Sequence, residues 1–441
     1  MGVLMQAFYW DCPKLEGKEY TWWDYVAGLV PSISSNGFTA LWLPPACKAA
    51  NIGGMSMGYD PYDYYDLGDV DQKGSKETWF GSKDQLLNLI KTAHNQNLLV
   101  YADLVINHNN GGDSEEVNPI DGKKRWTKFV PGSGKFPRDW ESFHPSYYES
   151  WDQMTFGDMP DLCHRNPDVY SQLIDYARWL IEIIGFDGFR YDFVKGYGGW
   201  MARAIQELRG LRNDVVYKPY GVGECWDGER SIDDWLDEVN AWSDNPVGAF
   251  DFPLRDRLKN LCDTNGYSLK NLAAGGTLVK DRPLDAVTFV ENHDIIRSNP
   301  IINDKMMAYA FILTHEGYPC VFWQDYYTFG LAQEGNKSGI AALVKAHEDF
   351  AAGPTSVLYV DDDLYIMQRS GFDGKKGLVF ALNNRANWYG TRVVTQWKNT
   401  RFSPVAWGGR DNGLPQDQLS QNDGSAEFYA PPRGYVVYVP Q

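Results

Sequence analysis

Apolar residues along this chain recur in two spacings that alternate. Within residues 169–184 they stand at positions 173, 174, 177, 180, 181 and 184, which is the spacing of one helix face. Gly185 is expected to end this helix, and a short strand-like run, 186–191, follows it. Charged residues then appear where the strand ends. A helix, a short strand and charges at the strand's exit are typical of a (β/α)8 barrel, in which functional groups lie at the carboxyl ends of the strands.

The same pattern predicts the other elements of the barrel. Short apolar runs predict further strands near residues 4–10, 38–45, 98–108, 220–227, 248–254, 286–294 and 318–325. Helical spacing predicts helices near residues 21–37, 82–97, 231–242 and 338–351. Ser82 is expected as an N-cap, and Pro31 is expected in the first turn of its helix or at a break.

The alternation stops in two places. Residues 104–162 carry GG, NP, DG and PGSG punctuation among many aromatic residues, and this stretch is too long for an ordinary connection. We interpret it as an irregular domain inserted after strand three. Residues 354–441 hold short β-type runs separated by turn dipeptides, which predict a C-terminal antiparallel, sandwich-like β domain. The barrel is therefore predicted over residues 1–103 and 163–353.

Polar residues suited to chemistry mark four predicted strand ends. They are Asn107 and His108, then Arg190 and Asp192, then Glu224, and finally Asn292, His293 and Asp294. Arg190 stands two residues before Asp192, so it shares the strand face and favours the ionised carboxylate that a nucleophile needs. An isolated Arg–Asp pair is as often structural as functional. Four such strand ends in this order point to a catalytic site.

These four stretches, GFRYDFVKGY among them, resemble the best-known motifs of the α-amylase family, which contains retaining α-glucan hydrolases. The likeness runs over essentially the whole chain, and QAFYWD, GYDPYDYYDLG and FGSKDQL belong to it as well. KGY after the aspartate and CWD after the glutamate bring the chain closest to archaeal and plant-type α-amylases. Many bacterial members carry a histidine where this chain has Gly196.

The resemblance assigns roles to three carboxylates. A retaining glycosidase needs a nucleophile on the sugar carbon and an acid that protonates the leaving oxygen. Asp192 is the expected nucleophile. Glu224 is the expected acid/base, which repulsion from Asp192 would help to keep protonated. Asp294 is expected to bind sugar hydroxyls and to stabilise the oxocarbenium-like transition state.

The resemblance also implies residues that bind the substrate. Tyr59 matches a tyrosine that stacks under the reacting sugar, and His108 and His293 match donors to its hydroxyls; Arg190 completes this side of the site. Lys195, Gly196, Tyr197 and Trp226 are expected to line the leaving-group side. Core packing competes as an explanation for any single aromatic or histidine. A Schiff-base role for Lys195 is disfavoured by the neighbouring carboxylates.

A calcium ion is the implied cofactor. In similar amylases it joins the inserted domain to the barrel, with ligands that match Asn107, Asp152, Asp161 and the backbone carbonyl of Gly196. Hard oxygen donors suit Ca²⁺. Without the resemblance, these acidic residues would be interpreted as solvent-exposed carboxylates in loops.

A second metal, Zn²⁺, is left open. His144 and Cys163 match two of its ligands in some archaeal relatives, but this chain has Glu149 where the third ligand there is a histidine. Glutamate can ligate zinc; we nevertheless favour the absence of zinc. His164 could take part only after a rearrangement of its loop.

Composition narrows the function classes. The net charge of −17 argues against nucleic acid and anionic membranes as partners. No apolar run reaches the ~20 residues of a membrane span, and no signal peptide is visible. The six cysteines show no disulfide framework. We expect a monomer that hydrolyses α-1,4-glucan internally, outside the cell or alternatively in the cytoplasm. A transglycosylase, a maltooligosaccharide-forming enzyme and a non-catalytic glucan-binding barrel are the alternatives.

Overall fold

Eight parallel strands close into a barrel in the computed structural model, which describes residues 2–13, 21–50, 56–150, 154–333, 335 and 337–441. Their order around the barrel is β1-β14-β13-β12-β11-β8-β5-β2. The predicted (β/α)8 barrel with a C-terminal β domain is therefore confirmed. The strands are β1 (Leu4–Gln6), β2 (Ala40–Trp42), β5 (Leu99–Leu104), β8 (Gly188–Tyr191), β11 (Tyr220–Gly223), β12 (Gly248–Phe250), β13 (Ala286–Phe289) and β14 (Tyr318–Phe322).

The chain forms two compact units, each of which contributes strands to this barrel. One consists of Trp10–Ser34 and Ala40–Phe250, and the other of Met1–Tyr9, Ser35–Thr39 and Asp251–Gln441. In the first unit β5 pairs with β2 and β8, and β8 pairs with β11. Its helices are α1 (Trp22–Ser35), α2 (Lys83–Asn95), α3 (Pro167–Trp179), α4 (Gly199–Gln206) and α5 (Glu229–Val239).

Local sequence signals explain where several of these helices begin and end. Ser82 caps α2 as predicted, and it forms a capping box with Gln85. Gly185 ends the helical stretch before β8 in the left-handed conformation, with φ of 97°, which glycine adopts without steric penalty. Residues 180–184 continue α3 as a π-helical turn. Pro31 lies inside α1, which runs through it without interruption, so the expected positions in the first turn or at a break are both wrong.

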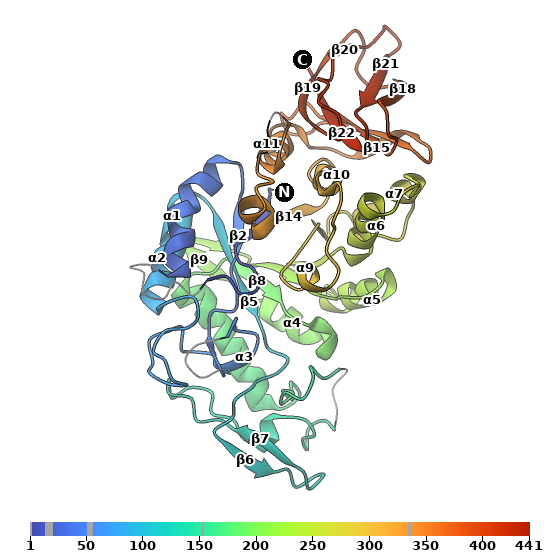
Figure 1. Cartoon of the computed structure of the whole chain (residues 1–441). Helices are drawn as coiled ribbons and strands as arrows, with labels where there is room; N and C mark the ends of the chain where they lie inside the picture. Colours follow the sequence, from blue (N-terminus) through green and yellow to red (C-terminus); the bar gives the residue numbers. More distant parts are fainter. Residues whose placement is uncertain (1, 14–20, 51–55, 151–153, 334, 336) are drawn as a thin grey trace. The chain divides into compact units, whose positions relative to one another are not determined.

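The segment between β5 and α3 holds little regular structure, in line with its irregular sequence. Its described residues contain the antiparallel pair β6 (Ser114–Val117) and β7 (Lys124–Lys128) (Figure 1). They also contain the 3-10 turn Trp140–Ser142. The same unit contains two further antiparallel pairs, β3 (Lys48–Ala49) with β4 (Pro61–Asp63), and β9 (Gly210–Arg212) with β10 (Val215–Tyr217).

The second unit joins three barrel strands to the C-terminal sheets. Its helices are α6 (Phe252–Asp263), α7 (Lys270–Ala273), α8 (Leu278–Asp281), α9 (Ile295–Ser298), α10 (Lys305–Ile312) and α11 (Ile340–Phe350). A six-stranded sheet has the order β15-β16-β17-β22-β19-β20, and β18 pairs with β21. These strands are β15 (Thr355–Val360), β16 (Leu364–Arg369), β17 (Leu378–Asn383), β18 (Tyr389–Val394), β19 (Arg401–Gly408), β20 (Gln418–Leu419), β21 (Ser425–Ala430) and β22 (Gly434–Pro440).

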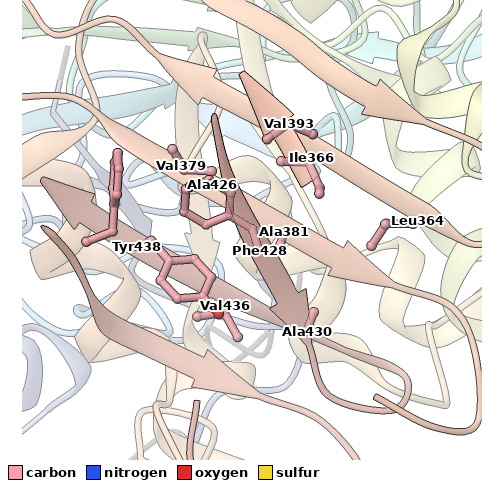
Figure 2. Close-up of a cluster of buried hydrophobic side chains, with 11 residues drawn as sticks. Leu364, Ile366, Val379, Ala381, Val393, Ala426, Phe428, Ala430, Val436 and Tyr438 are labelled. Carbon is pink, nitrogen blue, oxygen red and sulfur yellow. The ribbon is translucent and has the colours of Figure 1, made fainter. Parts of the chain in front are cut away.

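A buried apolar cluster lies between these two C-terminal sheets. Phe428 of β21 packs edge-to-face against Tyr438 of the larger sheet (Figure 2). It makes a second edge-to-face contact with Phe402 of the same sheet. Alternate residues of each strand supply the cluster, because successive side chains of a strand point to opposite faces. This separate core gives the C-terminal region the sandwich character predicted from its turn-rich sequence.

Candidate active site

Arg190 is the centre of a buried charge cluster at the end of β8. Its Nη1 lies 2.8 Å from Asp103 Oδ1 and 2.5 Å from Asp192 Oδ1, and its Nη2 lies 3.0 Å from Glu224 Oε2. All four side chains are at least nine-tenths buried. Burial alone would lower the pKa of Arg190, but the three carboxylates outweigh it and hold this pKa well above its usual value. The predicted Arg190–Asp192 pair is thus present, with two further partners.

The register of the barrel strands produces this cluster. Arg190 of β8 is level with Asp103 of β5 and with Val222 of β11. The backbone N–H of Asp192 donates to the carbonyl of Leu104, and that of Glu224 donates to the carbonyl of Tyr191. The ladder therefore continues just past each strand and fixes the two carboxylates at neighbouring strand ends.

Asp103 was not identified as a site residue from the sequence, although it contacts Arg190, Trp42 and Tyr59 in the cluster. Its Oδ2 accepts hydrogen bonds from Trp42 Nε1 at 3.0 Å and from the Tyr59 hydroxyl at 2.7 Å. Burial raises the pKa of Asp103 to about 7 in spite of the opposing charge of Arg190. The signal in the sequence was a single charged residue within an otherwise apolar strand. Tyr59, predicted to stack under the sugar, is held by this bond, and its ring also stacks on that of Trp10.

The backbone of Phe193 connects the two catalytic candidates. This residue follows Asp192 in a left-handed conformation, with φ of 43° and ψ of 50°. Its N–H donates to Glu224 Oε2 at 3.0 Å. A non-glycine residue in this region is destabilised by roughly 1–2 kcal/mol, so the surrounding structure must hold it there.

His108 is fully buried at the end of the β5 stretch. Its Nε2 lies 2.9 Å from the carbonyl oxygen of Tyr59, so Nε2 carries the ring proton. Burial lowers the pKa of His108, with the charge of Asp192 acting in the opposite direction. Phe156 stacks on the imidazole at 4.6 Å between centroids and at 8°, and it contacts Phe193 edge-on. Donation from His108 to a sugar hydroxyl would require the bond to Tyr59 to be exchanged, and that role stays a prediction.

The residues predicted for the leaving-group side fall into two groups. Lys195 Nζ donates to the carbonyl of Trp226 at 2.9 Å and to Asp227 Oδ2 at 3.2 Å, which ties the loops after β8 and β11 together. The Trp226 side chain is 45% exposed and is accessible to a ligand. Tyr197 is completely buried and packs against the His164 ring.

His293 and Asp294 follow β13 in the other unit. Asn292 Oδ1 accepts from the backbone N–H groups of Asp294 and Ile295 and so fixes the turn that starts α9. His293 Nε2 lies 3.3 Å from Asp294 Oδ2, and its Nδ1 lies 3.0 Å from Gln6 Nε2.

Comparisons with known proteins identify the family of this chain. The model of the α-amylase catalytic domain matches residues 26–330. The chain belongs to the α-amylase family. The α-amylase of Geobacillus stearothermophilus is 32% identical over 85% of this chain and 76% of its own length. The cytoplasmic α-amylase of Escherichia coli K12 is 28% identical over 99% of this chain and 98% of its own.

Solved structures of the family share the fold. The crystal structure of the α-amylase of Geobacillus thermoleovorans complexed with acarbose has a TM-score of 0.69 at 21% identity, over 100% of this chain and 98% of that one. Membership of this family makes the protein a glycoside hydrolase. Among the described residues, no helix is long and apolar enough to cross a membrane.

Three of the four residues expected to bind calcium are neighbours in the structure. Asn107 Oδ1 is buried and accepts no hydrogen bond from a described residue, and a Cβ on Gly196 would clash with this oxygen. Asp161 is buried and pairs with His108 in a β-bridge, while the N–H of Leu162 donates to the Asn107 carbonyl at 2.9 Å. Asp152, the remaining predicted ligand, lies outside the described residues.

The residues considered for a second metal also converge. Ligand atoms of His144, Glu149 and Cys163 all lie within 4.8 Å of one another. His164 points elsewhere, with its Nε2 2.9 Å from the carbonyl of Ile106. No disulfide joins any of the six cysteines, all of which lie within the described residues.

Proposed function

We infer that the protein is an α-amylase that hydrolyses internal α-1,4 bonds of starch, glycogen and maltooligosaccharides with retention of the anomeric configuration. The observation that carries this inference is the placement of Asp192 and Glu224 on the two terminal nitrogens of one buried guanidinium. Two carboxyl groups of a retaining enzyme stand only about 5–5.5 Å apart, whereas an inverting pair leaves room for a water molecule between them. A shared guanidinium favours the closer arrangement.

The reaction proceeds in two displacements. Glu224 gives its proton to the glycosidic oxygen while Asp192 Oδ attacks the anomeric carbon, so the C–O bond to the leaving chain breaks and a glycosyl ester forms. Water then enters, Glu224 takes its proton, and the hydroxide displaces Asp192 to restore the carboxylate. Each displacement inverts the anomeric carbon, and the two together retain its configuration.

Arg190 and the neighbouring groups prepare these steps. The guanidinium provides the positive charge that an ionised Asp192 requires in a buried site. The Phe193 N–H orients Glu224 through Oε2. We propose that Asp294, at the end of β13, binds hydroxyls of the reacting sugar and stabilises its developing positive charge, with His293 beside it.

Two members of the same fold family support the nearest alternatives. Glucan 1,4-α-maltohexaosidase of a Bacillus species is 30% identical over 80% of this chain and 76% of its own length. A cyclomaltodextrin glucanotransferase with a three-domain ABC distribution has a TM-score of 0.68 at 21% identity. Product analysis has to distinguish these activities from endo-hydrolysis. A non-catalytic glucan-binding barrel would have no need of all three carboxylates.

Proton NMR of fresh products from maltoheptaose tests the proposed function. We expect new α-anomeric ends from internal cleavage, and none from Asp192→Asn. New β-anomeric ends would refute the retaining mechanism. Chains longer than seven sugars would favour the transglycosylase, and glucan binding without cleavage by the wild-type protein would favour the binding module.

We propose that Ca²⁺ binds at Asn107, Asp161, Asp152 and the carbonyl of Gly196. The buried Oδ1 of Asn107, which lies beside Gly196 and accepts no hydrogen bond within the described part of the chain, supports this site, since calcium prefers an oxygen-rich set of ligands. The bound ion would supply structural charge compensation and connect the inserted segment to the end of β5. Removal of calcium with a chelator should lower the thermal unfolding temperature by several degrees, and added Ca²⁺ should restore it. An unchanged unfolding temperature would argue against the site.

The convergence of His144, Glu149 and Cys163 supports the second metal over its absence. Nitrogen, carboxylate and thiolate are all zinc ligands, and burial raises the pKa of Cys163, which a bound cation would reverse. Metal analysis of the purified protein should find about one Zn²⁺ per chain, lost in Cys163→Ser. Zinc-free protein that takes up no Zn²⁺ would restore the original expectation that zinc is absent.

The extracellular location is still a prediction. The name of the Escherichia coli relative supports the cytoplasmic alternative, and cell fractionation distinguishes the two.

A further inference from the structure

Gln6, the last residue of β1, makes a long-range contact with the end of β13. Its side chain is completely buried, and its Nε2 lies 3.0 Å from Nδ1 of His293, which is 287 positions away in the sequence. Phe8 packs against the same imidazole, with 5.0 Å between ring centroids and an angle of 47°. His293 is itself 1% exposed. The ring is therefore held on one edge by an amide and on its face by an aromatic residue.

This contact selects one tautomer of His293. An amide NH2 group can only donate, so Nδ1 must accept and the single proton of the neutral ring must be on Nε2. Nε2 lies 3.3 Å from Asp294 Oδ2, so the donor faces the carboxylate. Were the proton on Nδ1 instead, two donors would face each other at Gln6 and two acceptors would face each other at Asp294.

The other half of the Gln6 amide argues against a role in packing alone. Its Oε1 is buried and accepts no hydrogen bond from a described residue. A buried acceptor without a partner is unfavourable, and an apolar side chain of similar length would avoid it. A local penalty of this kind is typical of a residue retained for function.

We propose that Gln6 is a positioning residue of the glycosidase reaction, which keeps the Nε2–H tautomer of His293 directed at Asp294. This inference rests on the proposed function, in which Asp294 and His293 bind the reacting sugar. Loss of the amide donor would allow the Nδ1–H tautomer to form, and Asp294 would lose its neighbouring donor. The substrate would still bind through its other sugars, so the effect should fall on kcat more than on KM.

Nitrogen-15 NMR of histidine-labelled protein measures the tautomer directly. The chain has seven histidines, and the signals of His293 are assigned by their absence in His293→Asn. In the wild-type protein we expect a proton on Nε2 and none on Nδ1. In Gln6→Glu, an isosteric acceptor, we expect Nδ1 to carry a proton; in Gln6→Met, which neither donates nor accepts, we expect both tautomers. A wild-type ring with its proton on Nδ1 would overturn the proposal without any variant.

Kinetics on maltoheptaose complete the test. Gln6→Glu and Gln6→Met should each lower kcat by at least 10-fold and change KM by less than threefold. Met5→Leu is the matched control, because Met5 precedes Gln6 in β1 and points to the opposite face; its spectrum and kcat should equal those of the wild type. An unchanged tautomer and kcat in both Gln6 variants would refute the role. If the wild-type protein cleaves no glucan, the proposed function fails while the tautomer can still be measured.

Discussion

Replacement of Arg190 by lysine separates the charge of this residue from its shape. The guanidinium contacts Asp103 and Asp192 through Nη1 and Glu224 through Nη2. Lysine keeps the positive charge but offers one compact ammonium, which can replace the contacts of one terminal nitrogen and not of both. Arg190→Lys should therefore release one of the two carboxylates proposed for catalysis from its fixed position.

The magnitude follows from the contact that is lost. A hydrogen bond to a charged group contributes about 1.5–3 kcal/mol, so the free energy of unfolding should fall by about this amount. If the same free energy of stabilisation is lost in the transition state, kcat should fall by about 10- to 150-fold. Steady-state hydrolysis of maltoheptaose gives kcat and KM, and urea unfolding gives the stability of the same preparations.

A matched arginine serves as the control. Arg433 is also buried; its Nε lies 2.7 Å from Asp304 Oδ2 and its Nη2 donates to the carbonyl of Cys262 at 2.6 Å. Arg433→Lys should lose stability to a similar extent with kcat unchanged. Two results would refute the reasoning: a kcat for Arg190→Lys within threefold of the wild-type value, or an equal loss of kcat in both variants.

Three further predictions follow from the site and the core. Burial raises the pKa of Asp103 to about 7, so the contribution of this group to the free energy of unfolding is full below about pH 4 and is lost as the pH rises to about 7. Urea unfolding should show that Asp103→Asn removes this dependence of stability on pH. An unchanged pH dependence in the variant would contradict the prediction. Burial lowers the pKa of His315 to about 3, so its contribution is full above about pH 6.5 and is lost as the pH falls towards 3; His315→Phe should flatten acid unfolding over that range. Phe156→Ala removes the ring that covers His108, and it should lower kcat on maltoheptaose severalfold while the unfolding temperature stays within a few degrees; equal kcat values would show that the cover is dispensable.

Local signals in the sequence were enough to predict the barrel strands and the residues at their ends. Most of the strands are short and largely apolar runs, and Asp192 and Glu224 directly follow the ends of β8 and β11. Ser82 was predictable as a cap because its partner, Gln85, is only three residues away. Pro31 was expected in the first turn or at a break, but it lies within α1, because the packing of an apolar helix face can retain a proline that isolated propensity disfavours there.

Residues whose role depends on tertiary register could not be found in this way. In the sequence, Asp103 is a single charged residue within an apolar strand. Its role in the charge cluster follows only from the pairing of β5 with β8, which places it level with Arg190. Gln6 and His293 meet across 287 positions, and no sequence periodicity connects them. Phe156 lies in a stretch without regular structure, where neither helical nor strand spacing indicates which side chain points to the site.

The left-handed backbone at Phe193 restricts which residues this position can accept. One peptide unit there must turn the chain and also present its N–H to Glu224, so variation is limited by φ before any side-chain contact matters. In a saturation library, glycine and asparagine should be enriched among active clones, because both tolerate positive φ. Valine, isoleucine and proline should disappear together, although the first two match the hydrophobicity of the native residue. Sequence variation at the residue after Asp192 would thus reflect the backbone conformation that the hydrogen bond to Glu224 requires.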